Sequence, residues 1–540
     1  YDMYARFFRW AADRIDADGI IAYITNRSFI DSRTFDGFRL EMAREFDEAW
    51  IVDLGGDVRA NPKLSGTTHN VFGIQTGVAI SFWIKRKKAD KRTKHTCRIY
   101  YARRPEQESA ADKLAWLAST PFPQVEFEHL VPDAKGNWIN QADNDFEDLL
   151  PLCSKETKAA KTPNKERALF KLYSLGVVTN RDDWAYDFDP KHLAKKVSSF
   201  FIGFNEESIR WNKAGRPKDI TNFVSRQIKW TSELESHLSR GAHLEFDETL
   251  IKRALYRPFV TRFSYFARIF THRPYQQGSI FPMGLSAENM EICFMAGERQ
   301  DFAVIASDKL PDKNMFSADA VQCVSLYRYD ESGNRVDNIT DWGVGQFEKR
   351  YGKQAGVNRE SIFHYVYAVL HNPAYREKYA LNLKRELPRI PFYDDFAQWA
   401  AWGRELLALH IGFETVEPAP LRRSDLPGIA APKARLKADP AAGRILIDEA
   451  TTLADIPPAA WRYRLGNRSA LEWVLDQYKE SAPRDPTIRE KFNTYRFADY
   501  KEKVIDLLGR VCAVSVETQG IIEKMNAYPP QGETADEHNG

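Results

Sequence analysis

The chain has 540 residues, of which 43% are hydrophobic, 13% aromatic and 28% charged, so it is long enough for roughly two to four domains with real cores. The formal net charge of +2 excludes neither acidic nor basic partners, and five scattered cysteines without a Cys-x-x-Cys pair exclude a disulfide framework and a zinc knuckle. No apolar run is long enough to span a bilayer and no signal segment opens the chain, so we expect a cytoplasmic protein without a membrane partner.

The first hundred residues alternate helical and strand patterns. Apolar residues recur at helical spacing over residues 2–16, and residues 19–25 form a continuous apolar run that predicts an interior parallel strand. A polar corner follows, then a helix capped by Thr34 or Asp36 and strands at 49–54 and 78–84. This order predicts the distal half of a doubly wound α/β sheet.

Three features of this region are candidate contact sites. The corner at residues 25–27 follows a strand, where ligands of such sheets bind, although its polar groups can equally satisfy loop amides. The turn at 53–56 ends a strand as a cofactor-binding glycine turn does, but no helix follows it, so a tight structural turn is the alternative. Residues 85–104 carry ten Lys or Arg against one Asp, which suits either a solvated connection or a phosphate backbone.

Residues 105–165 are rich in proline and lack a clear period, so we expect a connector. Beyond it, residues 176–189 place Asn180 and Arg181 in a polar turn between an apolar run and an aromatic one. Because Asn pairs bidentately with adenine and Arg with guanine, these two side chains are candidates for contacts with DNA base edges. The alternative is an Asx-type turn with an arginine on its surface.

A second basic pattern interleaves arginines with aromatic residues. We expect phosphate contacts here, with Arg257 and Arg262 as the named candidates, although an amphipathic strand pair with one wet face produces the same pattern. The arginines are Arg253, Arg257, Arg262, Arg268 and Arg273, and the aromatic residues are Tyr256, Phe259, Phe263, Tyr265 and Phe266.

The remainder predicts mainly helices. Helices are expected at 361–370, 373–383, 469–478 and 499–512, with an irregular proline-rich crossing at 416–433 and one strand at 444–448. No histidine pair has metal-ligand spacing, so no metal site is predicted.

Several long stretches resemble a known family. GIIAYITNRSFI, RTFDGFRLEMAREF, AWIVDLGGDVR and NVFGIQTGVAISFWIKR are similar to the carboxyl half of an adenine-N6 DNA methyltransferase domain, and most similar to that of the Type ISP restriction-modification enzymes. GVVTNRDDWAYDFD, IFHYVYAVLHNPAYREKYALNLKRELPRIPFYDDF and LGNRSALEWVLDQY resemble the target-recognition region of that family. These enzymes join nuclease, helicase-like, methyltransferase and target-recognition parts in one chain.

The resemblance implies a domain plan. Residues 1–104 would be the distal half of a Rossmann-like methyltransferase sheet, and residues 166–415 a mixed α+β DNA target-recognition domain that follows the connector. Residues 416–540 would be its mainly helical C-terminal part. The implied partners are double-stranded DNA and the upstream nuclease, helicase-like and methyltransferase parts.

The implied chemistry is S-adenosylmethionine-dependent methylation of a flipped adenine. The resemblance places Phe72 where the family stacks an aromatic ring on that base, and the alternative is a loop phenylalanine tucked into the core. The family's Asn-Pro-Pro-Tyr turn and glycine-containing cofactor turn precede the matched segment, so we expect a fragment, beginning at Tyr1, that is inactive alone and has no cofactor-binding residues of its own.

A near-match to the catalytic motif and two rival functions complete the predictions. Asn372-Pro373-Ala374-Tyr375 nearly spells the catalytic turn, but it joins two helical patterns, so a helix cap with proline at the first position explains it. The rival function is a non-catalytic DNA-binding specificity subunit that acts with a separate methyltransferase chain. A small-molecule methyltransferase using the turn at 53–56 is a third possibility.

Overall fold

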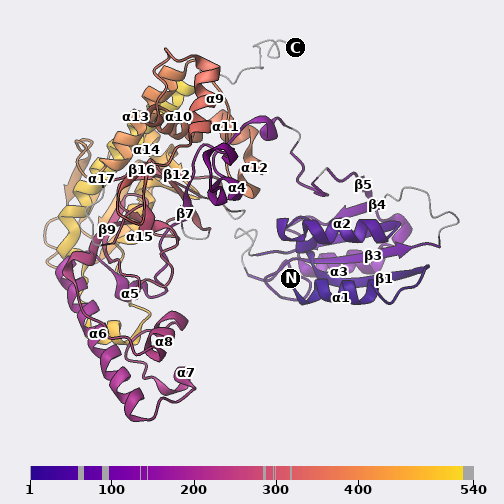
Figure 1. Cartoon of the computed structure of the whole chain (residues 1–540), viewed down its shortest axis with the longest axis horizontal. Helices are drawn as coiled ribbons and strands as arrows, with labels where there is room; N and C mark the ends of the chain where they lie inside the picture. The colour runs from indigo at the N-terminus through magenta and orange to yellow at the C-terminus, as the bar shows by residue number, and fades with distance from the viewer. Residues whose placement is uncertain are drawn as a thin grey trace. The chain divides into compact units, whose positions relative to one another are not determined.

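The computed structural model describes residues 2–58, 66–87, 97–133, 135–142, 144–283, 288–295, 297, 300–316 and 319–526. They form two compact units, Tyr1–Asn144 and Asp145–Gly540 (Figure 1). The boundary lies well beyond residue 104, so the predicted connector at 105–165 is wrong: its first part completes the first unit and its last part begins the second. Within the described ranges, no helix combines the length and apolarity needed to cross a membrane.

The first unit is built on a five-stranded sheet with the order β1-β3-β2-β4-β5. The strands are β1 (Gly19–Asn26), β2 (Glu48–Gly55), β3 (Val78–Lys85), β4 (Arg98–Arg103) and β5 (Glu128–Leu130). The strand β3 lies between β1 and β2 and is antiparallel to both, whereas the central strand β2 is parallel to β4. The predicted positions of β1, β2 and β3 are confirmed, but the prediction that β1 is an interior parallel strand is wrong. Among the described residues β1 pairs only with β3 and forms an edge of the sheet.

Helices cover the two faces of this sheet unequally. The helices α1 (Met3–Ala12) and α2 (Asp36–Glu45) contribute Phe8 and Met42 to a core around Trp83 on one face. On the other face, Trp116 of α3 (Ala110–Ser119) packs against residues of β2 and β3, which explains why this segment is not a connector.

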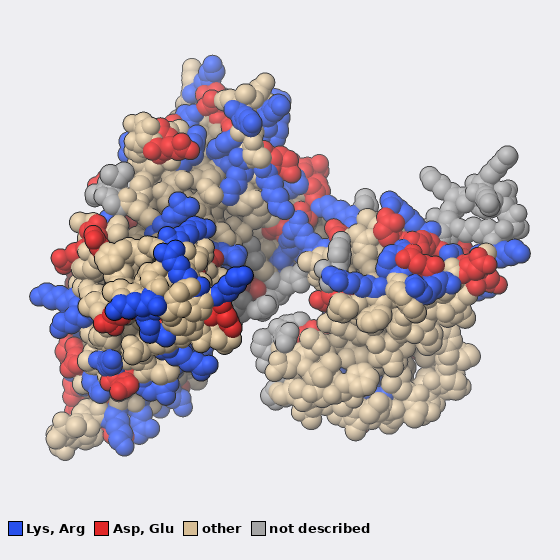
Figure 2. All heavy atoms as spheres, turned by 60° about the horizontal axis from the view of Figure 1, so that its bottom comes forward, with Lys and Arg blue, Asp and Glu red and all other residues tan. Residues whose placement is uncertain are grey.

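One strip of the second face stays open. Register pairs Ile20 with Ile84 and Ile24 with Ile80, so Ile20 and Ile24 of β1 share the face that α3 covers over its neighbours. Ile20 is 63% exposed and Ile24 is 56% exposed. The helix α1 also exposes Met3, Phe7 and Trp10. Figure 2 shows that the face of the first unit turned toward the viewer carries few charged side chains.

Two four-stranded sheets of the second unit are formed within residues 173–325. Their orders are β13-β9-β10-β8 and β12-β11-β14-β7. The strands are β7 (Tyr173–Leu175), β8 (Tyr186–Asp187), β9 (Ile251–Arg257), β10 (Val260–Tyr265), β11 (Glu291–Met295), β12 (Val304–Ser307), β13 (Leu310–Pro311) and β14 (Val321–Ser325). The long helix α6 (Pro190–Lys213) packs its buried Phe200, Phe201 and Phe204 into the core beside β10.

A helical layer follows. The helices α10 (Arg359–His371) and α13 (Phe396–Ile411) pack along each other in the core. The side chain of Asn372 accepts a hydrogen bond of 3.1 Å from the backbone N–H of Tyr375, so the near-match to a catalytic turn is a helix cap, as predicted.

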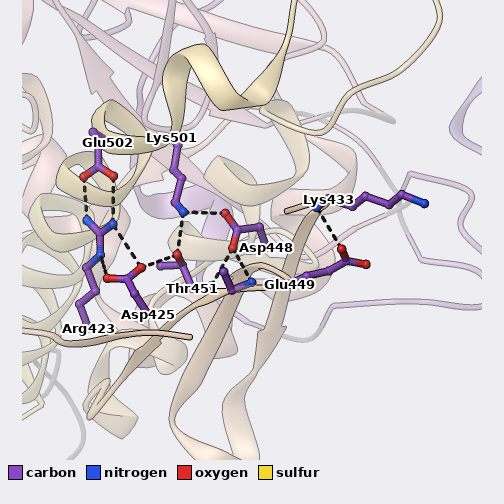
Figure 3. Close-up of polar contacts among 9 residues, drawn as sticks. Arg423, Asp425, Lys433, Asp448, Glu449, Thr451, Lys501 and Glu502 are labelled. Carbon is purple, nitrogen blue, oxygen red and sulfur yellow. Dashed lines mark hydrogen bonds and ion pairs between the residues drawn. The ribbon is translucent and has the colours of Figure 1, made fainter. Parts of the chain in front are cut away.

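The C-terminal part combines helices with a sheet that the sequence did not predict. Its four-stranded sheet, in the order β18-β21-β20-β19, consists of β18 (Arg422–Asp425), β19 (Ala434–Asp439), β20 (Arg444–Asp448) and β21 (Thr451–Ala454). Only β20 was predicted, because β18 is fully exposed, β19 has a single buried residue and β21 has only four residues, so none of these three shows an apolar run. The side chains of Lys501 and Glu502, at the start of α17 (Lys501–Met525), pair with Asp448 and Arg423 of this sheet (Figure 3).

The remaining elements are short helices and two-stranded pairs between these layers. The helices are α4 (Lys155–Ala159), α5 (Asp182–Ala185), α7 (Ile220–Phe223), α8 (Ser232–Ser239), α9 (Asp341–Tyr351), α11 (Pro373–Lys378), α12 (Ala380–Arg385), α14 (Pro458–Arg462), α15 (Ala470–Gln477) and α16 (Pro486–Lys491). The strand pairs are β15 (Tyr327–Tyr329) with β16 (Arg335–Asp337), β17 (Arg389–Ile390) with β6 (Leu150–Pro151), and β22 (Arg464–Leu465) with β23 (Arg468–Ser469).

Candidate nucleic-acid interface

Phe72 lies in the loop between β2 and β3 and its side chain points into solvent. The amide nitrogen of Asn70 donates to the carbonyls of Gly56 and Thr76 at 3.1 and 2.7 Å, and its oxygen accepts the Phe72 N–H at 3.0 Å. Asn70 is buried, so this loop is held by internal hydrogen bonds. Phe72 is nevertheless 60% exposed, which rules out the alternative of a ring tucked into the core. The loop therefore presents an unoccupied aromatic face.

The polar corner after β1 is occupied by a buried ion pair. The guanidinium of Arg27 donates to the carboxylate of Asp53 at 2.8 to 2.9 Å, and the hydroxyl of Tyr101 donates to the same carboxylate at 2.7 Å. Burial alone would raise the pKa of Asp53, but Arg27 and Tyr101 outweigh it and the pKa is lowered. The backbone N–H of Gly55 completes the set of donors. Asp53 is thus engaged on all sides, and the turn at 53–56 is a structural turn.

The basic run at 85–104 is only partly described, since residues 88–96 lie outside the described residues. Of its arginines, Arg86 and Arg98 contact the carboxylate of Glu48, and Arg104 pairs with Glu108. These pairs favour the interpretation of a solvated connection for the described part.

In the second unit, Asn180 lies at the tip of the turn between β7 and α5. Its φ of 54° is in the left-handed region, which Asn tolerates better than most residues, and its side chain is exposed. The turn is anchored on one side by hydrogen bonds between the backbones of Val178 and Arg273 at 3.0 and 3.1 Å. On the other side Asn180 lines a hollow of about 840 Å³. Its amide is available for contacts with a ligand.

Arg181, by contrast, lies inside the protein. It is 3% exposed, donates to the hydroxyl of Thr231 at 2.7 Å, and places its guanidinium 5.1 and 5.3 Å from the rings of Phe200 and Phe270. Burial lowers its pKa to about 10. A base contact by Arg181 stays a prediction, but this packing favours a positioning role for the turn that carries Asn180.

Arg257 and Arg262 are also packed against protein. Arg257 pairs with the buried Asp312 at 2.9 Å, and burial raises the pKa of that carboxyl to about 6. Arg262 lies 4.5 and 4.3 Å from the rings of Phe188 and Tyr256. These partners resemble those of structural arginines, and phosphate contacts by Arg257 and Arg262 stay a prediction. In the same pattern, Arg268 and Arg273 are exposed.

Glu291, Cys293 and Cys323 form a buried cluster that was not predicted from the sequence. The antiparallel register of β11 and β14 places the two cysteines opposite each other, and the potential metal-ligand atoms of the three residues lie within 4.8 Å of one another. Burial raises the pKa of both thiols and raises that of Glu291 to about 8. With all three groups protonated, the cluster carries no charge at neutral pH. No motif reveals it, because only strand pairing brings the residues together.

Replacing Glu291 by glutamine is expected to remove a pH-dependent loss of stability. Because the folded pKa lies above the ordinary value, the contribution of Glu291 is fully present below about pH 4.5 and is lost as the pH rises toward about 8. Each pKa unit corresponds to about 1.4 kcal/mol, so the difference should reach a few kcal/mol. Urea unfolding from pH 5 to 8 should therefore show a flatter profile for Glu291→Gln than for wild type or the exposed control Glu245→Gln. Identical slopes would contradict this assignment.

Comparisons with known proteins support the same regions. A family model described as the Type ISP C-terminal specificity domain matches residues 168–507. A solved structure titled as a DrdV–DNA complex is 46% identical over 98% of this chain, with a TM-score of 0.85, and 52% of that chain is covered. A search of curated proteins gave no match.

Two other solved structures are similar over the same span. A nuclease-deletion mutant of the Type ISP restriction-modification enzyme LlaGI, in complex with a DNA substrate mimic, is 26% identical over 98% of this chain, with a TM-score of 0.80 and 48% of that chain covered. The ATP-dependent Type ISP enzyme LlaBIII bound to DNA is 24% identical over 98% of this chain, with a TM-score of 0.82, and supports the fold. The chain spans 52%, 48% and 34% of the lengths of these three proteins.

Proposed function

The chain belongs to the Type ISP restriction-modification family, and from this premise we propose that it reads a DNA target sequence for S-adenosylmethionine-dependent adenine-N6 methylation by a longer enzyme. The match to the specificity domain, which contains the Asn180 turn, is the observation that carries the proposal. Two of the similar solved structures support it, because DrdV is in a complex with DNA and the LlaGI mutant is in a complex with a DNA substrate mimic.

In this proposal the second unit binds duplex DNA and reads it. Asn180 contacts a base edge, since its amide is exposed at the tip of an anchored turn. Arg181 holds that turn by its packing against Phe200 and Phe270. Figure 2 shows Lys and Arg side chains gathered over the end of this unit that carries α6 to α8, as suits a polyanionic partner.

The first unit supplies one wall of the pocket for a flipped adenine. The exposed ring of Phe72 is suited to stack on the extruded base. The cofactor and the catalytic acceptors of the exocyclic amine come from methyltransferase strands beyond this chain, so the chain alone does not transfer methyl groups. Within the part of the chain that the structure describes, β1 has no partner on its outer edge, and this edge and the exposed side chains of Ile20 and Ile24 support a neighbour at this place.

That neighbour is either an upstream part of the same polypeptide or a separate methyltransferase chain. The free edge of β1 fits both arrangements equally. The upstream reading frame separates them, because an encoded Asn-Pro-Pro-Tyr turn just before residue 1 establishes the single-chain enzyme. The third possibility, a small-molecule methyltransferase, loses its support because Arg27 and Tyr101 already occupy the carboxylate of Asp53.

Replacing Asn180 by glycine is expected to relax sequence discrimination at one base pair. Glycine retains the left-handed backbone without the amide, and loss of one bidentate base contact costs about 1 to 3 kcal/mol of discrimination. Duplexes selected from a random pool by the wild-type chain should therefore lose their preference at one position with Asn180→Gly. The control Asn467→Gly, in another exposed turn, should keep it.

Two different outcomes would contradict the role of Asn180 and the proposed function. An unchanged preference in Asn180→Gly removes Asn180 from the base contacts. Absence of any duplex preference in the wild-type chain overturns the proposed function itself.

A further inference from the structure

A second hollow of the specificity unit is lined mainly by basic residues. It measures about 400 Å³ and is formed by α8 and the segment that follows β10. Its lining includes Glu233, His237, Arg240, Arg268, His272 and Arg273. The helix α8 also contributes Glu235 to the larger hollow beside Asn180, so the two hollows share this helix.

The charges in this hollow are unbalanced. Arg240, Arg268 and Arg273 are all exposed, and no carboxylate among the described residues lies within 4.0 Å of their guanidinium groups. The one acid in the lining, Glu233, contacts His272 instead. Burial, together with the positive charges of Arg240 and Arg268, lowers the pKa of His237, as expected in a cationic environment.

Other arginines of the same unit behave differently. Arg253 pairs with Glu414, Arg257 with Asp312 and Arg210 with Glu207. Guanidinium groups near carboxylates have their donors occupied, whereas those of Arg240, Arg268 and Arg273 keep theirs for a ligand. Three such groups around one hollow suit an anion with several acceptor oxygens.

The backbone connects this hollow to the base-reading turn. Arg273 exchanges two hydrogen bonds with Val178, which lies two residues before Asn180. Tyr275, at the rim, is 37% exposed and has a φ of 49°, so the chain turns sharply there. The spacing between the arginines and the Asn180 turn is therefore set by strand-like pairing rather than by a loose loop.

We propose that this basic hollow holds backbone phosphates of duplex DNA and thereby sets the register in which Asn180 meets the base edges. The inference rests on the proposed function and adds to it the place where the DNA backbone is held. Phosphate contacts fix the position of a protein on a duplex, whereas base contacts carry sequence information. Arginine is suited to this task, because its planar fork of donors matches a phosphate group.

The double substitution Arg268→Ala/Arg273→Ala in the full chain tests the proposal. Each lost phosphate contact should reduce the slope of log K against log salt by about 0.9, so the slope should fall by about 2 in magnitude. Affinity should fall about tenfold or more for every duplex at low salt, with the order of preferred sequences unchanged. Fluorescence anisotropy with labelled duplexes at several salt concentrations measures both quantities.

A matched control removes the same charge elsewhere. Arg435→Ala/Arg444→Ala deletes two exposed arginines that pair with Glu449 and Asp439, and it should leave the salt slope unchanged. Thermal unfolding should be close to wild type for both double variants, because the substituted side chains are exposed. Any loss of affinity then reports on contacts with DNA.

Each outcome decides the assignment. If the wild-type chain binds DNA selectively and Arg268→Ala/Arg273→Ala has the same affinity and the same salt slope, the phosphate site is overturned and the proposed function stays intact. An altered preference at single base pairs shows that these arginines read bases, and also overturns it. Inorganic phosphate that binds wild type but not the double variant, while both bind duplexes with the same affinity and salt slope, makes the hollow a free-anion site instead. A wild-type chain that binds no duplex overturns the proposed function rather than this site alone.

Discussion

Replacing Phe72 by alanine in the complete enzyme is expected to lower methyl-transfer turnover about ten- to a hundredfold, while duplex binding stays nearly unchanged. The ring is exposed on a loop that Asn70 holds from inside, so its removal should leave the loop folded. Stacking of a base on an aromatic ring is worth about 1 to 3 kcal/mol, and that energy is lost only once the adenine has left the duplex. Single-turnover transfer of a labelled methyl group measures the effect.

The control lies in the same loop. Ile74 is also exposed but has no aromatic face, so Ile74→Ala should keep wild-type turnover. Phe72→Trp should retain most of the activity, since a larger ring still stacks. Wild-type turnover in Phe72→Ala would exclude Phe72 from the base pocket and leave it a solvent-exposed loop residue.

Replacing Asp53 by alanine is expected to destabilise the first unit by about 3 to 5 kcal/mol, because it leaves the buried guanidinium of Arg27 without its principal counter-charge. The hydroxyl of Tyr101 and the N–H of Gly55 also lose their acceptor. Since the pKa of Asp53 is lowered, its stabilising contribution is present at neutral pH and is lost as the solution becomes acidic. Hydrogen exchange of the amides of β1 and β2 in increasing urea measures the change.

Two further variants serve as controls for this stability measurement. Asp13→Ala removes a carboxylate that pairs with Arg9 on the exposed surface, and it should cost less than about 1 kcal/mol. The double variant Arg27→Met/Asp53→Leu should recover part of the loss, because no buried charge then remains unpaired. An Asp53→Ala unit as stable as wild type would show that the pair contributes no net stability.

The sheet of the first unit shows which structural features local sequence patterns can predict. The apolar runs placed β1, β2 and β3 within one residue or so of their observed bounds, because strand length and apolar character are local properties. The same runs misled about the neighbours of β1, because an apolar strand at the edge of a sheet and an apolar strand between two others have similar composition. The helix α3 was missed because its apolar face is only Trp116 and a few neighbours, which pack on a distant strand.

The candidate contact residues were likewise predicted only in part. The aromatic and basic interleaving located a surface that includes Arg268 and Arg273, but it could not show that Arg257 and Arg262 lie against Asp312 and two rings. Asn180 was predicted at a turn and is found at one, with its side chain exposed. Its neighbour Arg181 points inward, and the turn pattern contains nothing that distinguishes the two directions.

By itself the sequence determined the positions of β1, β2, β3 and β20, of several helices, the cap at Asn372 and the resemblance to the Type ISP family, since each depends on residues that are adjacent along the chain. Only the tertiary structure decided that Arg27 meets Asp53, that Cys293 faces Cys323, and which arginines remain free for a ligand. The physical reason is that burial and ion pairing depend on partners that folding brings from distant segments. The periodicity of a segment indicates on which face of its own helix or strand each side chain lies. The residues that pack against that face belong to other segments, so periodicity cannot identify them.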